Sequence, residues 1–123
     1  MKTILVVDDE PDFTDAVKVL LEDEGYRVHT AGDGITCLDS LKNNKPDLVL
    51  LDVMIPYING FEVLKAMKNQ LEFRSIPVIL MSASRPKINN LNDKLLIFLA
   101  KPFDLETLLK NIRDLIEASK AAA

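Results

Sequence analysis

The sequence contains one cysteine, no excess of positive charge and no long apolar run, and each absence excludes a class of protein. Cys37 alone cannot form an internal disulfide, which suits a reducing compartment, so we expect a cytoplasmic protein. The net charge of −4 argues against direct binding to nucleic acid, because nucleic-acid-binding proteins usually carry clustered Lys and Arg. The first apolar run stops at Asp8, too early for a signal-peptide core, and no run is long enough for membrane insertion.

Length and composition predict a single folded domain. The 123 residues are 48% hydrophobic and 28% charged, close to ordinary soluble domains and far from disordered chains. A chain of this length buries roughly two-thirds of the surface that its unfolded form exposes, which is enough for one core. We expect the domain to span residues 1–119 and a frayed tail, Lys-Ala-Ala-Ala, to follow at 120–123.

Five short apolar runs predict β-strands. Residues 4–7, 48–51 and 78–81 lack polar alternation, as expected for strands that are covered on both faces of a parallel sheet. A fourth run spans residues 95–99, and a weaker, alternating run spans residues 26–31.

Apolar residues at helical spacing between these runs predict four helices. The first begins at Pro11, a residue favoured at the first helical position, and stops before Gly25. Asp104 is placed to cap the last helix. The apolar positions of the four helices are Phe13, Val17, Leu20 and Leu21; Ile35, Leu38 and Leu41; Phe61, Leu64, Met67 and Leu71; and Leu105, Leu108, Leu109, Ile112, Leu115 and Ile116.

Residues 85–94 form a weaker helical candidate between the fourth and fifth strands. They include three Asn and an Asp, which are poor residues for a helix interior, and the apolar stripe is limited to Ile88, Leu91 and Leu95. We therefore expect the fourth helix of the chain to be short or irregular. The repeated alternation of strand and helix predicts an α/β fold with right-handed crossovers and helices on both faces of one sheet.

Polar residues that can bind metal or phosphate end four of the five predicted strands. Asp8 and Asp9 follow the first, Asp52 the third, Ser82 the fourth and Lys101 the fifth. In doubly wound sheets, ligands bind outside these carboxyl ends. Two carboxylates 4 Å apart repel by about 4 kcal/mol at an effective dielectric constant near 20, so such a cluster must protonate or hold cations. Lys101 and a divalent cation would resolve the conflict, and Mg²⁺ suits best because it takes oxygen ligands.

Four separated motifs resemble those of response-regulator receiver domains of two-component signalling, the family that includes chemotaxis regulators. The resemblance covers essentially the whole chain, and four motifs in the right order are more specific than one short pattern. It implies a flavodoxin-like, doubly wound sheet of five parallel strands in the order 2-1-3-4-5. The motifs are Asp8-Asp9, Leu51-Asp52-Val53-Met54-Ile55-Pro56 with Gly60, Ser82-Ala83, and Lys101-Pro102-Phe103.

The resemblance also implies roles for the acidic residues. Asp52 would be the nucleophile that attacks the phosphorus of a phosphohistidine or a small acyl phosphate and becomes an aspartyl phosphate. Asp9, Asp52 and the backbone carbonyl of Met54 would bind Mg²⁺ directly, with Mn²⁺ as an alternative ion, while Asp8 would act through bound water. Glu10 could lie around the metal without binding it directly, but the favoured interpretation is that it simply leads into the first helix.

Three further residues have roles by resemblance. Lys101 would neutralise charge on the phosphoryl oxygens, and in the family the peptide bond between it and Pro102 is cis. Ser82 would hydrogen-bond the new phosphate. Phe98 matches the switch aromatic of the family, with a plain core phenylalanine as the alternative. The signal would then reach the surface around the fourth helix, the fifth strand and the last helix.

The implied function is a phosphorylation-dependent signalling switch, a phospho-acceptor rather than an enzyme. Its partners would be a sensor histidine kinase or phosphotransfer protein and a downstream protein that the sequence does not identify. Two alternatives have specific requirements. A haloacid-dehalogenase-like phosphatase would need a second Asp where Met54 stands, and a degenerate receiver that docks partners without phosphorylation would not need the complete set of site residues.

Overall fold

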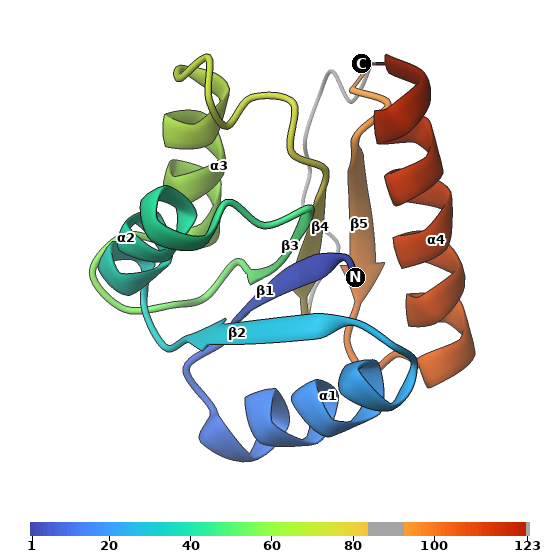
Figure 1. Cartoon of the computed structure of the whole chain (residues 1–123). Helices are drawn as coiled ribbons and strands as arrows, with labels where there is room; N and C mark the ends of the chain where they lie inside the picture. The colour runs from blue at the N-terminus through green and yellow to red at the C-terminus, as the bar shows by residue number, and fades with distance from the viewer. Residues whose placement is uncertain (84–92, 123) are drawn as a thin grey trace.

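The computed structural model describes residues 1–83 and 93–122. Within them, five parallel strands form one sheet in the order β2-β1-β3-β4-β5 (Figure 1), as the resemblance implied. The strands are β1 (Thr3–Val7), β2 (Arg27–Ala31), β3 (Leu48–Asp52), β4 (Val78–Ser82) and β5 (Leu96–Ala100).

The predicted strand limits agree with the structure to within one residue at each end. Two of the small differences bear on function, because Asp52 and Ser82 are the last residues of β3 and β4 and not the first residues of the loops. Asp52 is paired with Met81 across the sheet, and Ser82 is paired with Ala100. The backbones of both polar residues are therefore held by the sheet.

Four helices accompany the strands in the described parts of the chain: α1 (Pro11–Asp23), α2 (Gly34–Asn44), α3 (Gly60–Lys68) and α4 (Leu105–Ala122). Asp104 caps α4 as predicted, since its carboxylate accepts a hydrogen bond from the Thr107 backbone N–H at 2.7 Å. Because α4 continues to Ala122, residues 120–122 are helical, although we expected a frayed tail there. A domain boundary at residue 119 stays a prediction.

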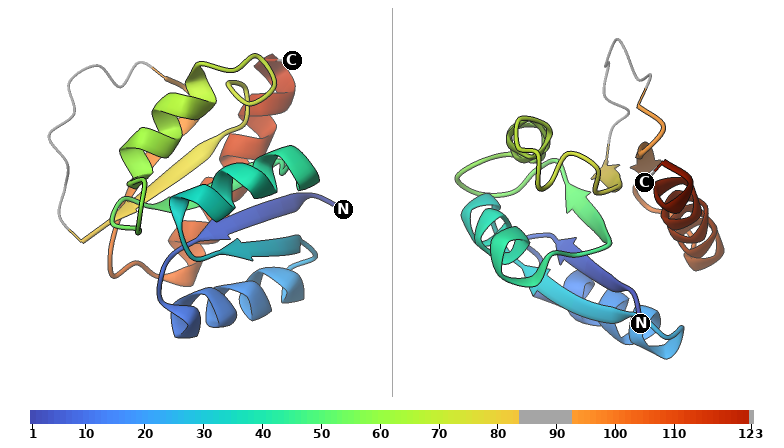
Figure 2. Two further views of the ribbon diagram at one scale, coloured as in Figure 1. Left: turned by 90° about the vertical axis from the view of Figure 1, so that its left-hand side faces the viewer. Right: turned by 45° about the horizontal axis from the view of Figure 1, so that its top comes forward.

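The sheet separates two hydrophobic cores. Helices α1 and α4 cover one face, and α2 and α3 cover the other (Figure 1, Figure 2). Side chains alternate along the strands, so Ile4 and Val6 belong to the first core, while Leu5 and Val7 belong to the second. Each central strand is thus buried on both sides, which explains its unbroken apolar sequence.

Three residues that we assigned to buried helix faces are exposed instead. Leu71 is 78% exposed because α3 ends at Lys68, where Asn69 serves as the C-cap and the chain leaves the helix. Leu20 on α1 and Ile35 on α2 are 42% and 50% exposed. The buried stripes of these two helices are narrower than the spacing of their apolar residues suggested.

The helical segment predicted at 85–94 lies almost entirely outside the described residues, so its short or irregular character stays a prediction. The described chain resumes at Asp93, whose carboxylate lies 2.6 Å from Lys68 Nζ and accepts a hydrogen bond from the Leu95 backbone N–H at 2.9 Å. This pair ties the entry to β5 to the last turn of α3. Across residues 1–83 and 93–122, no helix has the length and apolar character needed to cross a membrane.

Candidate functional site at the carboxyl ends of the strands

Lys101 joins two acidic residues from distant parts of the chain. Asp8 directly follows β1, Asp52 ends β3, and Lys101 directly follows β5, so the parallel topology brings all three to one edge of the sheet. The Lys101 Nζ donates hydrogen bonds to Asp8 Oδ2 at 2.6 Å and to Asp52 Oδ2 at 2.7 Å. These distances are typical of charge-assisted hydrogen bonds.

Asp8 is held by the backbone as well as by Lys101. Its N–H donates to the carbonyl oxygen of Ala31 at 3.1 Å, and its Oδ1 accepts from the Glu10 N–H at 3.0 Å. The residue is only 2% exposed. Burial raises the pKa of the Asp8 carboxyl, and neighbouring Asp52 adds to this rise, although Lys101 and the Glu10 amide act in the opposite direction. A second cation near Asp8 would therefore stabilise its charged form.

Asp52 is fixed at the base of the loop between β3 and α3. Its Oδ1 accepts a hydrogen bond from the Met54 N–H at 2.8 Å. Gly60 closes this loop, because its N–H donates to the Val53 carbonyl oxygen at 2.9 Å. A Cβ atom on Gly60 would lie 2.5 Å from the Asp52 carbonyl oxygen. The absence of a side chain at Gly60 therefore allows α3 to begin directly against the end of β3.

Lys101 is positioned by its own backbone and by its charge partners. Its N–H donates to the Ser82 carbonyl oxygen at 2.8 Å, and its peptide bond to Pro102 is cis, as the resemblance implied. Partial burial disfavours the charged ammonium, but the hydrogen bonds and negative charges of Asp52 and Asp8 outweigh burial and raise the pKa of Lys101. Lys101 is therefore a stable positive charge at the site.

A group of three acidic residues could hold a metal ion. Carboxylate oxygens of Asp8, Asp9 and Glu10 lie within 4.8 Å of one another, and Asp9 and Glu10 are exposed. Oxygen donors are what Mg²⁺ requires, and Lys101 supplies one positive charge against the negative charges of Asp8, Asp9 and Asp52. The donor set thus fits a divalent cation. Glu10 belongs to this group as well, although the favoured interpretation of the sequence was that it only leads into the first helix.

The remaining predicted site residues lie close to this edge. Ser82 is 8% exposed at the end of β4, and Met54 has a 75% exposed side chain just after Asp52. Phe98 is half-buried in β5 and packs against the core beneath α2 and α3. Its packing agrees equally with a switch aromatic and with a core residue, so both interpretations stay open.

Sequence reasoning missed one contact of Lys101. The Phe13 ring on α1 lies with its centroid 4.5 Å from Lys101 Nζ, and Phe103 packs against Phe13 with the two ring planes nearly perpendicular. The sequence identified Phe13 as part of an apolar helix face, which indicates burial but does not identify the neighbour. The Lys-Pro-Phe motif following the fifth strand was the available signal that an aromatic pair could form there.

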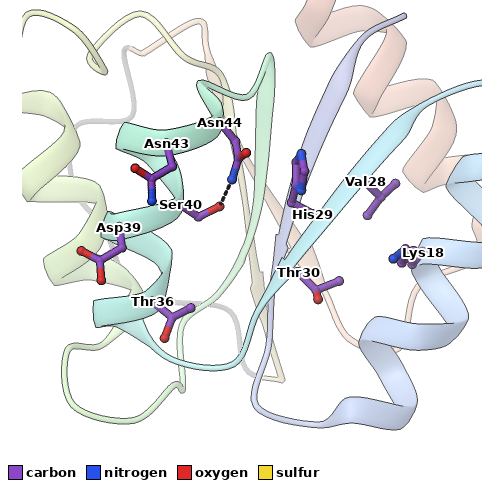
Figure 3. Close-up of a pocket in the computed structure, with 9 residues that line it drawn as sticks. All are labelled: Lys18, Val28, His29, Thr30, Thr36, Asp39, Ser40, Asn43 and Asn44. Carbon is purple, nitrogen blue, oxygen red and sulfur yellow. Dashed lines mark hydrogen bonds between the residues drawn. The ribbon is translucent and has the colours of Figure 1, made fainter.

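A separate hollow of about 410 Å³ lies along the edge strand β2, between α1 and α2 (Figure 3). His29 lines it from β2, and Asp39 is the one acidic residue in its lining. The dashed bond in Figure 3 joins Asn44 Nδ2 and Ser40 Oγ, 3.1 Å apart on α2. With neither a cysteine nor a second histidine in this lining, His29 lacks the partners of a transition-metal site.

Comparisons with known proteins agree with this geometry. The sequence model of the response regulator receiver domain matches residues 4–113. The DNA-binding dual master transcriptional regulator RpaA of Synechocystis is 35% identical over 119 residues, which cover 94% of this chain and 49% of RpaA. The probable transcriptional regulatory protein TcrX of Mycobacterium tuberculosis is also 35% identical, over 93% of this chain and 49% of its own length. This chain thus spans about half the length of these two relatives.

Solved structures show the same similarity. The chemotaxis protein CheY4 of Vibrio cholerae superposes with a TM-score of 0.81 at 30% identity, over 94% of this chain and 98% of that one. The second structure is the receiver domain of a sensor histidine kinase from Pseudomonas aeruginosa, solved with a magnesium ion coordinated in its active site cleft. It superposes with a TM-score of 0.84 at 28% identity, over 94% of this chain and 98% of that one. The family match over residues 4–113, together with these relatives, places the chain in the response regulator receiver domain family.

Proposed function

We propose that this receiver domain is a phosphorylation-dependent signalling switch in which Asp52 accepts the phosphoryl group. The observation that carries the proposal is the position of Lys101 Nζ, which contacts Asp52 Oδ2 at 2.7 Å and Asp8 Oδ2 at 2.6 Å. Asp52 thereby lies beside a fixed positive charge. A phosphoryl group bonded to Asp52 would therefore lie next to the positive charge of Lys101.

The reaction is a transfer of one phosphoryl group. An oxygen of the Asp52 carboxylate forms a bond to phosphorus, while the bond from phosphorus to the imidazole nitrogen of a phosphohistidine, or to the oxygen of an acyl phosphate, breaks. The leaving group keeps the electron pair of that bond. Lys101 offsets the negative charge on the phosphoryl oxygens, and such positioning and electrostatic stabilisation supply most of the catalysis in phosphoryl transfer.

The divalent cation is the second part of the proposal. Asp9, Asp52 and the Met54 carbonyl would hold Mg²⁺, or Mn²⁺ in its place, with Asp8 acting through bound water and Glu10 lying beside them. When bound, the ion supplies positive charge that offsets the phosphate oxygens and the acidic cluster. Support comes from the carboxylate group in this chain and from the similar Pseudomonas receiver domain that contains magnesium.

We further propose that phosphorylation changes the surface around β5, α4 and the segment that leads into β5. Ser82 would bond to the new phosphate, and Phe98 would respond. This order of events is supported by the sheet register, since Ser82 pairs with Ala100 and Leu80 pairs with Phe98 on the same two strands. A movement at the end of β4 is therefore passed directly to β5.

The partners follow from this chemistry. A sensor histidine kinase or a phosphotransfer protein in the cytoplasm would supply the phosphoryl group, and a downstream protein would receive the signal. RpaA is named as a DNA-binding regulator, but this chain matches about half of its length. With a net charge of −4, these 123 residues are not expected to bind nucleic acid directly. Membrane insertion is not expected either, because no apolar run is long enough.

Acetyl phosphate with Mg²⁺ tests the proposal, with intact-mass measurement as the readout. The wild type should gain one phosphoryl group. Asp52→Asn should gain none and keep its circular dichroism spectrum, because the exchange is nearly isosteric. The matched control is Asp39→Asn, which changes an exposed acid on α2 and should be labelled like the wild type.

Three results would contradict the proposal in different ways. Labelling of Asp52→Asn would show that another residue accepts the phosphoryl group. Continuous release of phosphate by the wild type, without accumulation of the labelled protein, would indicate a phosphatase. Absence of labelling from both acetyl phosphate and histidine phosphodonors would indicate a degenerate receiver that acts by docking alone.

A further inference from the structure

Phe13 contacts the lysine of the site in addition to the two carboxylates that bind it. The ring lies in the first turns of α1, and its centroid is 4.5 Å from Lys101 Nζ. At this distance an ammonium group is attracted to the negative face of an aromatic ring. Lys101 therefore has three contacts that restrain its charged end, namely Asp8, Asp52 and Phe13.

The position of the Phe13 ring is set by the hydrophobic core and not by the site. Phe13 and Phe103 both pack against the core beneath α1 and α4. The two rings meet edge to face, with centroids 6.1 Å apart and planes at 86°. Phe13 is therefore anchored in the core while its ring also contacts Lys101.

An open space beside Lys101 makes the position of its ammonium group depend on the contact with Phe13. A hollow of about 420 Å³ is lined by Glu10, Phe13, Ala83, Lys101, Pro102 and Phe103. A lysine side chain has four flexible carbon–carbon bonds, so without the ring its ammonium has room to move away from the carboxylates. The contact with the ring reduces the number of positions that the ammonium can take.

The ring matters most during phosphoryl transfer. When an Asp52 oxygen bonds to phosphorus, that oxygen loses most of its negative charge and its attraction for Lys101. The contact with Phe13 is unaffected by this change, because the ring takes no part in the reaction. Phe13 would thus keep Lys101 directed toward the phosphoryl oxygens while the Asp52 contact weakens.

We propose that Phe13 is a positioning residue for Lys101, whose ring face holds the ammonium group where it can meet the phosphoryl group on Asp52. The inference rests on the proposed function of Asp52. It predicts that the strength of the cation–π contact controls the rate of phosphorylation, and that the loss of apolar volume at position 13 does not.

Stepwise fluorination of the Phe13 ring tests this prediction. One, two and three fluorine atoms, introduced with a site-specific fluorinated phenylalanine, progressively reduce the negative charge on the ring face and keep its shape. The rate of phosphorylation by acetyl phosphate at saturating Mg²⁺ should fall with each step, and Phe13→Leu should lower it by roughly threefold to tenfold. The same series at Phe73, a core residue with 2% exposure, is the control and should leave the rate unchanged.

A second readout reports the contact itself without any phosphodonor. The ring current of Phe13 should shift the NMR signals of the Lys101 side-chain methylene protons upfield, and Phe13→Leu should remove this shift. A rate that does not respond to fluorination, in a wild type that is phosphorylated, would overturn the inference and leave the proposed function intact. A wild type that takes up no phosphoryl group would overturn both.

Discussion

Gly34 lies directly against the backbone of Ile58, so the start of α2 supports the loop between β3 and α3. A Cβ atom on Gly34 would be 2.4 Å from the Ile58 carbonyl oxygen, a distance that real side chains do not reach. The Gly34 N–H also donates to the Pro56 carbonyl oxygen at 3.3 Å. The supported loop contains Met54, whose N–H donates to Asp52 Oδ1 at 2.8 Å. Packing at Gly34 therefore bears on the position of the phospho-acceptor.

We predict that Gly34→Ala lowers the free energy of unfolding by about 1–3 kcal/mol, because the new methyl group forces the loop or the helix to move. Gly32→Ala is the matched control, since nothing lies within 4 Å of a Cβ at Gly32 and its φ is not in the left-handed region. This control should be neutral or slightly stabilising. Urea denaturation measures the free energy of unfolding of both variants. Equal values would show that the loop moves to accept the methyl group without loss of stability.

Topology explains why the sequence predicted most of the site. Parallel strands end at one edge, so Asp8, Asp52 and Lys101, each at the end of an apolar run, had to converge there. The contact between Phe13 and Lys101 could not be predicted in this way. It depends on the angle between α1 and the loop after β5, which helical spacing does not define.

The exposed position of Leu71 shows a second limit of sequence reasoning. Leu71 continues the spacing of the Phe61, Leu64 and Met67 stripe, yet the helix ends at Lys68. The match of Leu71 to the helical spacing is a coincidence, because this residue comes after the last residue of α3. Helix ends are decided by local capping, and Asn69 gave only a weak signal of this kind.

This difference yields a direct test of packing. Leu71→Ala should change the free energy of unfolding by less than about 0.5 kcal/mol, since the side chain is 78% exposed. Leu41→Ala, at a fully buried position of α2, should lower it by about 2–5 kcal/mol because it leaves a cavity. Urea denaturation compares the two. A large loss of stability in Leu71→Ala would show that this side chain packs in the core, as the helical spacing predicted.

Mg²⁺ should raise the melting temperature of the protein, because a ligand that binds the folded state stabilises it by mass action. At an ion concentration 100 times the dissociation constant, the gain is about 2.7 kcal/mol. Asp9→Ala should reduce this gain, since Asp9 belongs to the acidic group of Asp8, Asp9 and Glu10. Asp39→Ala, on the exposed surface of α2, is the control. An equal response to Mg²⁺ in the wild type and in Asp9→Ala would place the ion elsewhere.

Cys37 should be almost unreactive in the folded protein. The side chain is fully buried on α2, and burial, together with the charge of Asp33, raises the pKa of the thiol to about 12. Since only the thiolate reacts, labelling with a thiol reagent at pH 8 should be roughly a thousandfold slower than for the unfolded chain. The denatured protein is the control. Native labelling at the rate of a free cysteine would show that α2 does not hold Cys37 in the core.

The ion pair between Lys68 and Asp93 should make stability depend on pH. Partial burial favours the protonated carboxyl, but the hydrogen bonds from Lys68 and the Leu95 amide, with the charge of Lys68, outweigh it and lower the pKa of Asp93. A lowered pKa in the folded state means that the charged carboxylate stabilises the fold above the unfolded pKa, near 3.9, and that this contribution disappears as the pH falls through the folded pKa.

Asp93→Asn should therefore be less stable than the wild type at pH 7 by about 0.5–1 kcal/mol, because both side chains of the pair are partly exposed. The difference should stay constant down to about pH 5 and shrink below pH 4, as the wild-type carboxylate takes up its proton. Asp114→Asn removes the more exposed pair with Lys110 and serves as the control, with an effect near zero. Urea denaturation from pH 7 to about pH 3 measures all three proteins. A difference that persists unchanged at the lowest pH would mean that the amide loses packing or hydrogen bonds, and that the charge of Asp93 contributes nothing to stability.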